Sequence, residues 1–212
     1  MTALLPRYGL YAITDSQQLH GTPLEAAVEQ AIKGGARMIQ YREKQQPMQQ
    51  RSETAGKLAG LCRDYRLPLI INDDIELAAR CGAAGVHLGA TDGTVRDARK
   101  HLGNTAIIGA SCYSNLELAQ AAVTDGADYV AFGRFFPSRS KPDAVAANTD
   151  LLTQAKQLLS VPIVAIGGIT PENGAALVDA GADMLAAIHG VFGQKDIEAA
   201  ARCYDELFDE TH

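Results

Sequence analysis

Pro68-Leu69-Ile70-Ile71-Asn72-Asp73-Asp74 is an apolar run of strand length that ends in an amide and two carboxylates. The same arrangement, a short apolar run closed by polar, ionisable or glycine residues, recurs along the chain. The other endings are Ile13–Asp15, Gln40–Lys44, His87–Gly89, Ala110–Ser111, Gly133, Gly167–Gly168 and Ile188–Gly190. This regularity predicts a set of strands that all present their polar residues at the same end.

Eight such runs predict eight short parallel strands, because they are apolar and rich in Val and Ile, as helix-covered strands are. The predicted strands span Gly9–Thr14, Met38–Glu43, Pro68–Asp73, Gly85–Gly89, Ala106–Ser111, Tyr129–Gly133, Pro162–Gly168 and Met184–Gly190. The segments between them read as helices, with start signals at Thr22, Ser114 and Thr170. No linker divides the chain. An open doubly wound sheet would favour a G-x-G-x-x-G after the first strand, and this motif is absent there. We therefore expect one domain over residues 1–212, a (β/α)8 TIM barrel with its active site at the C-terminal rim.

The composition is that of a folded protein with a net acidic charge. The 212 residues are 47% hydrophobic, and the formal net charge is -6. An acidic chain argues against nucleic acid or an anionic membrane as the main partner, although it allows a local basic pocket. No apolar stretch approaches the roughly 20 residues of a membrane helix, and no signal peptide is visible. The four cysteines form no C-x-x-C, so we expect buried thiols in a cytoplasmic protein rather than zinc ligands or disulfides.

The segment Gln40-Tyr41-Arg42-Glu43-Lys44 combines two cations and an amide at a predicted strand end. If the strand continues through it, Gln40, Arg42 and Lys44 lie on one face, since alternate side chains of a strand share a face. Such a group at a barrel mouth suits an anionic ligand. A solvated charged loop with an Arg–Glu pair is an equally good interpretation of this segment alone.

Two carboxylates follow neighbouring predicted strands and suit a magnesium ion. Asp73 ends one strand, and Asp92 lies just beyond the end of the next. Mg²⁺ typically takes one or two carboxylates, several waters and substrate phosphates. Asp74 is expected to cap the following helix instead, and His87 to be a hydrogen-bonded residue of the barrel interior.

Two further segments suit phosphate groups. The loop Gly133–Pro142 carries hydroxyls, arginines and a lysine, and loops of this kind in barrels often close over ligands, although an ordinary surface loop is the alternative. Gly167 and Gly168 allow backbone N–H groups to approach a phosphate, and together with Ile188–Gly190 they predict a phosphate cup. The chain thus has two predicted anion sites, which two phosphorylated substrates, one of them a diphosphate, would fill.

These segments, in this order and spacing, resemble the thiamine phosphate synthase family over the whole chain. The resemblance rests on Tyr11–Asp15, Gln40–Lys44, Ile71–Asp74, Gly85–Gly89 with Asp92, Ile108–Ser111, Phe136–Pro142 and Ala165–Ile169. It implies that the diphosphate of 4-amino-5-hydroxymethyl-2-methylpyrimidine leaves and that the ring nitrogen of a thiazole phosphate takes its place. The products would be thiamine phosphate and pyrophosphate.

The resemblance also implies roles for individual residues. The contacts to the pyrimidine diphosphate would come from Gln40, Arg42, Lys44, Asn72, Ser111 and Lys141, of which Arg42, Lys44, Ser111 and Lys141 would be catalytic. Asp73 and Asp92 would hold Mg²⁺. The thiazole phosphate would be surrounded by Ser138, Ser140, Gly168, Ile188 and His189. Ser138 and Ser140 stand where threonine is usual in the family, and His189 stands where serine is common.

Three other functions remain as alternatives. The related thiazole tautomerase aromatises a thiazole carboxylate phosphate and would not need a complete diphosphate and Mg²⁺ set. A non-catalytic phosphate-ligand sensor could use the same barrel. A sugar-phosphate epimerase would need a metal–histidine set or opposed acid–base carboxylates, and neither is visible. The intact set of cations and carboxylates favours the synthase, with two small phosphorylated substrates as partners and self-association left open.

Overall fold

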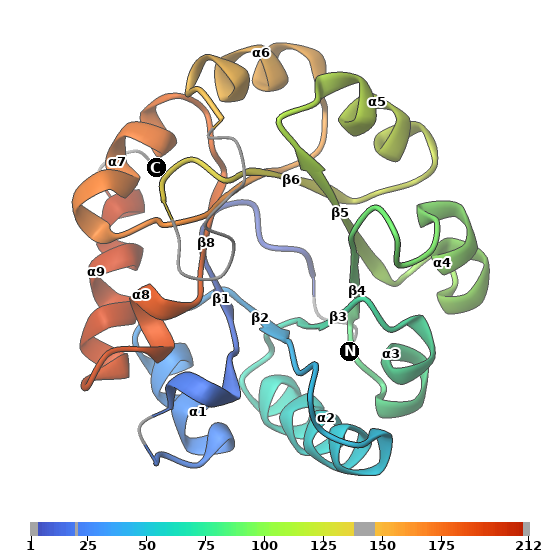
Figure 1. Cartoon of the computed structure of the whole chain (residues 1–212), viewed down its shortest axis with the longest axis vertical. Coiled ribbons are helices and arrows are strands. Elements are labelled where there is room, and N and C mark those ends of the chain that lie inside the picture. The colour runs from blue at the N-terminus through green and yellow to red at the C-terminus, as the bar shows by residue number, and fades with distance from the viewer. Residues whose placement is uncertain (1–3, 20, 138–146, 210–212) are drawn as a thin grey trace.

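The computed structural model describes residues 4–19, 21–137 and 147–209, and these form a closed barrel of eight parallel strands inside a ring of helices (Figure 1). The strands are β1 (Gly9–Ile13), β2 (Met38–Tyr41), β3 (Leu69–Asn72), β4 (Gly85–Leu88), β5 (Ile107–Tyr113), β6 (Tyr129–Gly133), β7 (Ile163–Ile166) and β8 (Met184–Ala187). Each strand pairs with its neighbours in chain order, and β8 closes the barrel against β1. The predicted fold class is confirmed.

The helices between the strands cover the outside of the barrel (Figure 1). They are α1 (Leu24–Lys33), α2 (Met48–Asp64), α3 (Ile75–Cys81), α4 (Val95–Leu102), α5 (Leu116–Thr124), α6 (Asp150–Leu158), α7 (Pro171–Asp179), α8 (His189–Phe192) and α9 (Ile197–Asp209), with a short 3-10 helix, η1 (Ser16–Gln18), after β1. Within the described residues, no helix is both long and apolar enough to cross a membrane.

The strands are buried on both faces, which explains their nearly continuous apolar sequences. In β1, Leu10 and Ala12 belong to the large core beneath the helices, whereas Tyr11 and Ile13 belong to a second cluster inside the barrel. This alternation is the period of two that a strand imposes on its side chains. The barrel interior is therefore a packed core, and the polar residues collect where the strands end.

Several strands end earlier than predicted. The predicted strand Met38–Glu43 stops at Tyr41, because the main-chain N–H of Arg42 donates to the Thr14 hydroxyl at 3.0 Å instead of to a strand. Residue Asp73 lies outside β3 because its backbone is left-handed, with φ of 65°. The alternation assumed for residues 40–44 is consequently wrong beyond Tyr41.

The helix-start signals were predicted with mixed success. Thr170 precedes α7, as predicted, and forms a capping box with Asn173 that was not predicted. Asp74 caps α3, as predicted, by accepting from the Leu77 N–H at 2.8 Å. Helix α5 is capped by Asn115 rather than Ser114. For α1, Pro23 stands at the cap position that Thr22 was expected to hold.

The cysteines are free thiols, but they are not uniformly buried as expected. Cys62 and Cys112 are buried, Cys81 is half-buried and Cys203 is exposed on α9. The expectation of four buried thiols is wrong for the last two, because each lies near the outer surface of a helix of the ring.

Candidate functional site

A chain of hydrogen bonds crosses the barrel interior and joins two of the predicted substrate residues. The Gln40 side-chain amide donates to the Tyr11 hydroxyl at 2.7 Å, and the Tyr11 and Tyr129 hydroxyls lie 2.8 Å apart. The Tyr129 hydroxyl lies 3.0 Å from His87 Nδ1, and His87 Nε2 lies 2.9 Å from the Ser111 hydroxyl. Five strands thus hold one polar network in an otherwise apolar barrel.

Burial sets the protonation states in this network. The pKa of His87 is lowered to about 4, because burial disfavours the charged imidazolium, so the ring is neutral at neutral pH. Burial also raises the pKa values of Tyr11 and Tyr129, and both remain phenols. His87 therefore has the interior, hydrogen-bonded position that the sequence predicted. Sequence reasoning gave neither tyrosine a role, although Tyr11 begins one of the segments that carry the family resemblance.

The carboxylates Asp73 and Asp92 lie together at the rim, as predicted. Lys44 Nζ lies 3.2 Å from Asp73 Oδ2, although the Lys44 side chain is exposed. The pKa of Asp92 is raised, first by burial and then by the negative charge of Asp73, with which it shares a hydrogen bond. Two like charges held this close favour a cation between or beside them.

The position of Asp92 depends on a close approach to the main chain. The Gly89 N–H donates to Asp92 Oδ2 at 3.1 Å, and a Cβ atom at Gly89 would lie 2.5 Å from that oxygen. A side chain at residue 89 would displace the carboxylate. Gly89, the residue directly after β4, therefore makes room for Asp92.

A cleft of about 620 Å³ opens outward from these carboxylates between α3 and α4. It is lined by Glu43, Lys44, Arg51, Asn72, Asp73, Asp74, Ile75, Glu76, Asp92, Asp97 and His101. Arg51, from α2, was not predicted, and its guanidinium lies 3.1 Å from Asp74 in the cleft wall. The sequence offers no pattern that would distinguish Arg51 from the other polar residues of its helix.

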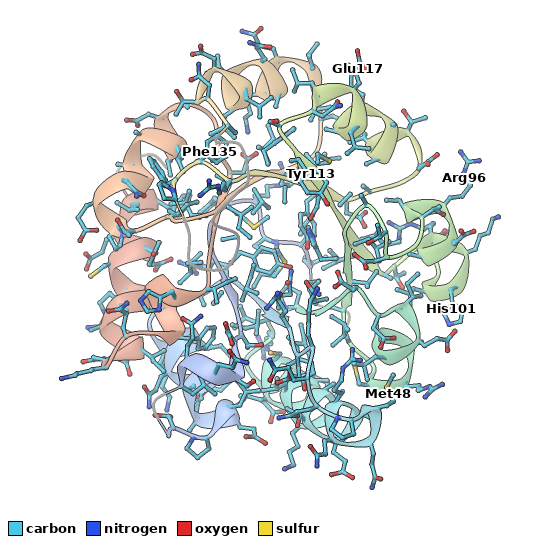
Figure 2. The ribbon with its side chains drawn as sticks, viewed as in Figure 1. Met48, Arg96, His101, Tyr113, Glu117 and Phe135 are labelled. Carbon is cyan, nitrogen blue, oxygen red and sulfur yellow. The ribbon has the colours of Figure 1, made fainter. Side chains whose placement is uncertain are left out.

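Other charged helix residues point away from the barrel. Figure 2 shows Arg96 and Glu117 pointing outward from α4 and α5. Glu43, next to the predicted cation cluster, accepts from the Ser16 hydroxyl at 2.6 Å and from the Gln45 N–H at 2.7 Å. Within the described ranges no Arg42–Glu43 ion pair forms, which weakens the alternative of a self-neutralised charged loop.

The glycine pair lies on the opposite side of the rim, after β7. Gly167 and Gly168 have φ values of 106° and 65°, which side chains rarely adopt. The loop after β6 lies against them, since the Phe136 N–H donates to the Gly167 carbonyl at 3.0 Å. A Cβ atom at Gly168 would lie 2.3 Å from the Pro137 carbonyl oxygen. Both glycines are thus required by close backbone contact and by conformation.

The other half of the predicted phosphate cup contacts η1, the short helix that follows β1. Ile188 precedes α8, and His189 is its first residue. The His189 Nδ1 atom lies 2.7 Å from Gln18 Oε1, and the Gln18 amide donates to Asp15 Oδ2 at 2.7 Å. Asp15, for which the sequence indicated no role, therefore helps to orient His189 through Gln18.

Residues 10–191 match the model of a family described as thiamine monophosphate synthase. The chain belongs to this family. It is similar to the thiamine-phosphate synthase of Nitrosococcus oceani, with 52% identity over 94% of the chain and 92% of that relative. It is also similar to the thiamine-phosphate synthase of Marinobacter nauticus, with 51% identity over 97% of the chain and 93% of that relative.

Solved structures agree with this membership of the thiamine monophosphate synthase family. A thiamine phosphate pyrophosphorylase from Pyrococcus furiosus superposes with a TM-score of 0.87 at 33% identity, with 96% of both chains covered. The (S)-3-O-geranylgeranylglyceryl phosphate synthase of Thermoplasma acidophilum has a TM-score of 0.69 over 96% of this chain and 94% of its own, but at 19% identity this likeness shows the fold alone.

Three of the residues that the family resemblance singled out, Ser138, Ser140 and Lys141, lie outside the described residues. The others lie at the rim or in the network just beneath it. Gln40 and Ser111 belong to the interior network, whereas Lys44, Asn72, Asp73 and Asp92 line the cleft. Arg42, half-buried, lies directly after β2, and Gly168, Ile188 and His189 lie at the ends of β7 and β8.

Proposed function

We propose that this protein is a thiamine-phosphate synthase that joins a pyrimidine diphosphate to a thiazole phosphate. The bond between the pyrimidine methylene carbon and the diphosphate oxygen breaks, and its electron pair leaves with pyrophosphate. The thiazole ring nitrogen supplies the pair for the new bond. The observation that carries this proposal is the grouping of Lys44, Asp73 and Asp92 at one rim of a barrel of the thiamine monophosphate synthase family.

The carboxylate pair fits Mg²⁺ by its chemistry. Within the described part of the chain no cluster of three or more histidine, cysteine, aspartate or glutamate side chains could hold a metal by itself. Mg²⁺ needs no such cluster, because it binds through one or two carboxylates, waters and substrate phosphates. We assign Asp73 and Asp92 to this ion. Burial first and then their mutual repulsion raise the pKa of Asp92, and the ion would relieve that repulsion. When bound, Mg²⁺ would neutralise charge on the departing diphosphate.

The chain's own cations serve the same leaving group. Lys44 already lies beside Asp73, and we place Arg42 and Lys141 at the diphosphate as well. Positive charge that is fixed before the reaction stabilises the charge that develops as pyrophosphate leaves. Asn72, at the end of β3, and Gln40 and Ser111 would orient the pyrimidine substrate.

The thiazole phosphate would bind across the rim from the diphosphate. Gly168 would approach it through the main chain, and Ile188 and His189 would contribute at the start of α8, with the hydroxyls of Ser138 and Ser140. Holding the thiazole nitrogen near the breaking bond contributes mainly orientation, so no covalent enzyme intermediate is needed. Running the reaction with each thiazole phosphate, with and without the ring carboxylate, shows which form the site prefers.

The test is a mixture of the full chain with the pyrimidine diphosphate, the thiazole phosphate and Mg²⁺. We expect pyrophosphate and thiamine phosphate to form in equal amounts, and the yield to fall when the thiazole phosphate or Mg²⁺ is omitted. Aromatisation of a thiazole carboxylate phosphate without pyrophosphate release would favour the tautomerase instead. Tight binding of either phosphate without turnover would favour the sensor. A cytoplasmic location and self-association remain predictions.

A further inference from the structure

The hydrogen-bonded network inside the barrel has a direction that follows from the orientation of the Gln40 amide, whose nitrogen faces Tyr11. The Gln40 amide nitrogen can only donate, so the Tyr11 oxygen accepts that bond and its single proton is left for Tyr129. The Tyr129 proton is then available only to His87 Nδ1, which must accept it. A neutral imidazole that accepts at Nδ1 carries its proton on Nε2.

The last bond of the network decides the state of Ser111. His87 Nε2, as N–H, donates to the Ser111 oxygen at 2.9 Å. The Ser111 proton is then not used within the network and is free for an acceptor outside it. If the network ran the other way, Ser111 would donate to His87 and could offer a ligand only its lone pairs.

Burial prevents any one bond of this network from reversing alone. Tyr11, Gln40 and Tyr129 are 1%, 2% and 0% exposed, so water cannot replace a lost bond. A buried polar group without a partner is strongly unfavourable, and bonds in a chain strengthen one another. The Tyr129 ring also packs closely against β5, because a Cβ atom at Gly109 would lie 2.0 Å from Tyr129 Cζ. Gly109 thus admits the Tyr129 ring into the barrel beside β5.

We propose that Tyr11, Tyr129 and His87 are positioning residues that carry the orientation of the Gln40 amide to Ser111 and make its hydroxyl a hydrogen-bond donor to the diphosphate substrate. The inference rests on the proposed function for the identity of that substrate. None of the three residues needs to touch the substrate, because each acts through its neighbour in the network. The pyrimidine diphosphate offers several acceptor atoms, and a serine fixed as a donor selects for them.

The first experiment measures the direction itself and needs no substrate. In the full chain with ¹⁵N-labelled histidine, the two-bond ¹H–¹⁵N correlation spectrum reports which ring nitrogen of His87 carries the proton. We expect a single form with the proton on Nε2. A proton on Nδ1, or on both nitrogens, would overturn the proposal whether or not the protein makes thiamine phosphate.

The second experiment is a double-mutant cycle on pyrophosphate release. We expect Tyr129→Phe to lower kcat/KM for the pyrimidine diphosphate about tenfold, the effect of one lost hydrogen bond. In the Ser111→Ala background the same substitution should change kcat/KM less than about twofold, since it acts through Ser111. Equal losses in both backgrounds would show a merely structural role, and no loss in either would also refute the proposal.

A matched control separates this coupling from the general effect of losing a buried phenol. Tyr204, on α9, is also fully buried and donates to the Ile169 carbonyl at 2.7 Å, outside the network. Tyr204→Phe should leave the His87 spectrum unchanged and have the same small effect in both backgrounds. If Tyr129→Phe does not fold, Tyr11→Phe interrupts the network one bond earlier and should give the same non-additive result with Ser111→Ala. An additive result would again overturn the proposal. A wild-type chain that releases no pyrophosphate would refute the proposed function and leave the spectrum as the test.

Discussion

Replacing Gly168 with alanine tests the phosphate cup after β7. The residue has φ of 65°, and a Cβ atom there would lie 2.3 Å from the Pro137 carbonyl oxygen and 2.8 Å from that of Phe136. Gly82, at the end of α3, is a matched control, because its φ is 66° and a Cβ atom there would meet nothing within 4 Å. The two substitutions share the conformational cost and differ in the steric one.

The expected magnitudes follow from these two contributions. A left-handed backbone costs a residue with a Cβ atom about 1–2 kcal/mol, which is the whole effect expected for Gly82→Ala. Gly168→Ala adds a close contact that only a backbone shift of about 1 Å can relieve, and such overpacking costs about 1–3 kcal/mol more. The shift would move the loop that the Phe136 N–H anchors to the Gly167 carbonyl.

Stability and kinetics would both be measured. The chain has no tryptophan, so urea unfolding would be followed by circular dichroism. For Gly168→Ala we expect KM for the thiazole phosphate to rise at least about tenfold, because a misplacement of about 1 Å in a binding site is that damaging. KM for the pyrimidine diphosphate should rise less, since of the residues proposed for that substrate only Lys141 belongs to the loop Gly133–Pro142. Gly82→Ala should leave both KM values unchanged.

The reasoning would be refuted in either of two ways. Equal losses of stability in the two variants would mean that the contact with Pro137 relaxes without cost. A larger loss of stability for Gly168→Ala with an unchanged KM for the thiazole phosphate would mean that this loop has no part in binding that substrate.

Three other predictions concern the carboxylates, the rim lysine and the histidine of the cup. The raised pKa of Asp92 means that its protonated form stabilises the metal-free fold at low pH and that this contribution is lost as the pH rises through the raised pKa. Asp92→Asn should therefore raise the melting temperature of metal-free protein at pH 7 by about 1–2 °C in calorimetry. Turnover at limiting Mg²⁺ should fall at least about tenfold. A lower melting temperature or unchanged turnover would contradict this. Lys44→Met should lower kcat about 100-fold, because the ammonium lies beside Asp73 at the proposed diphosphate site. The urea midpoint should hardly change, because the side chain is mostly exposed. Equal losses of activity and stability would count against this prediction. Gln18→Leu should release the His189 ring and raise KM for the thiazole phosphate about threefold, which is the effect of less than one hydrogen bond. Steady-state kinetics would check this, with an unchanged KM for the pyrimidine diphosphate as the internal control.

Much of the fold was predictable because strand ends carry strong local signals. The eight apolar runs, the cap at Asp74 and the helix start at Thr170 depend mainly on neighbouring residues. The exact ends of the strands were less predictable. Strand β2 ends before Arg42 because the Arg42 N–H donates to the hydroxyl of Thr14, the residue after β1, and that contact spans 28 positions of the chain.

The candidate site divides in the same way. Asp73, Asp92 and Lys44 could be selected from the sequence, because carboxylates and cations that follow parallel strands must meet at one rim. Arg51 and the two network tyrosines could not, since their importance comes from partners on distant elements. Tyr11 and Tyr129 are 118 positions apart and touch only because the barrel closes.

The class of the fold, the end of the barrel that carries the site and the types of group that meet there could all be inferred from the amino-acid order. These depend on local periodicity and on the rule that parallel strands share their carboxyl ends. Which of those groups bond to one another became visible only in the folded barrel. The state of His87, the place of Asp92 beside Gly89 and the orientation of His189 through Gln18 and Asp15 each depend on atoms brought together by barrel closure or by a tight turn. Burial then gives these contacts their strength, because inside the barrel no water can replace a missing partner.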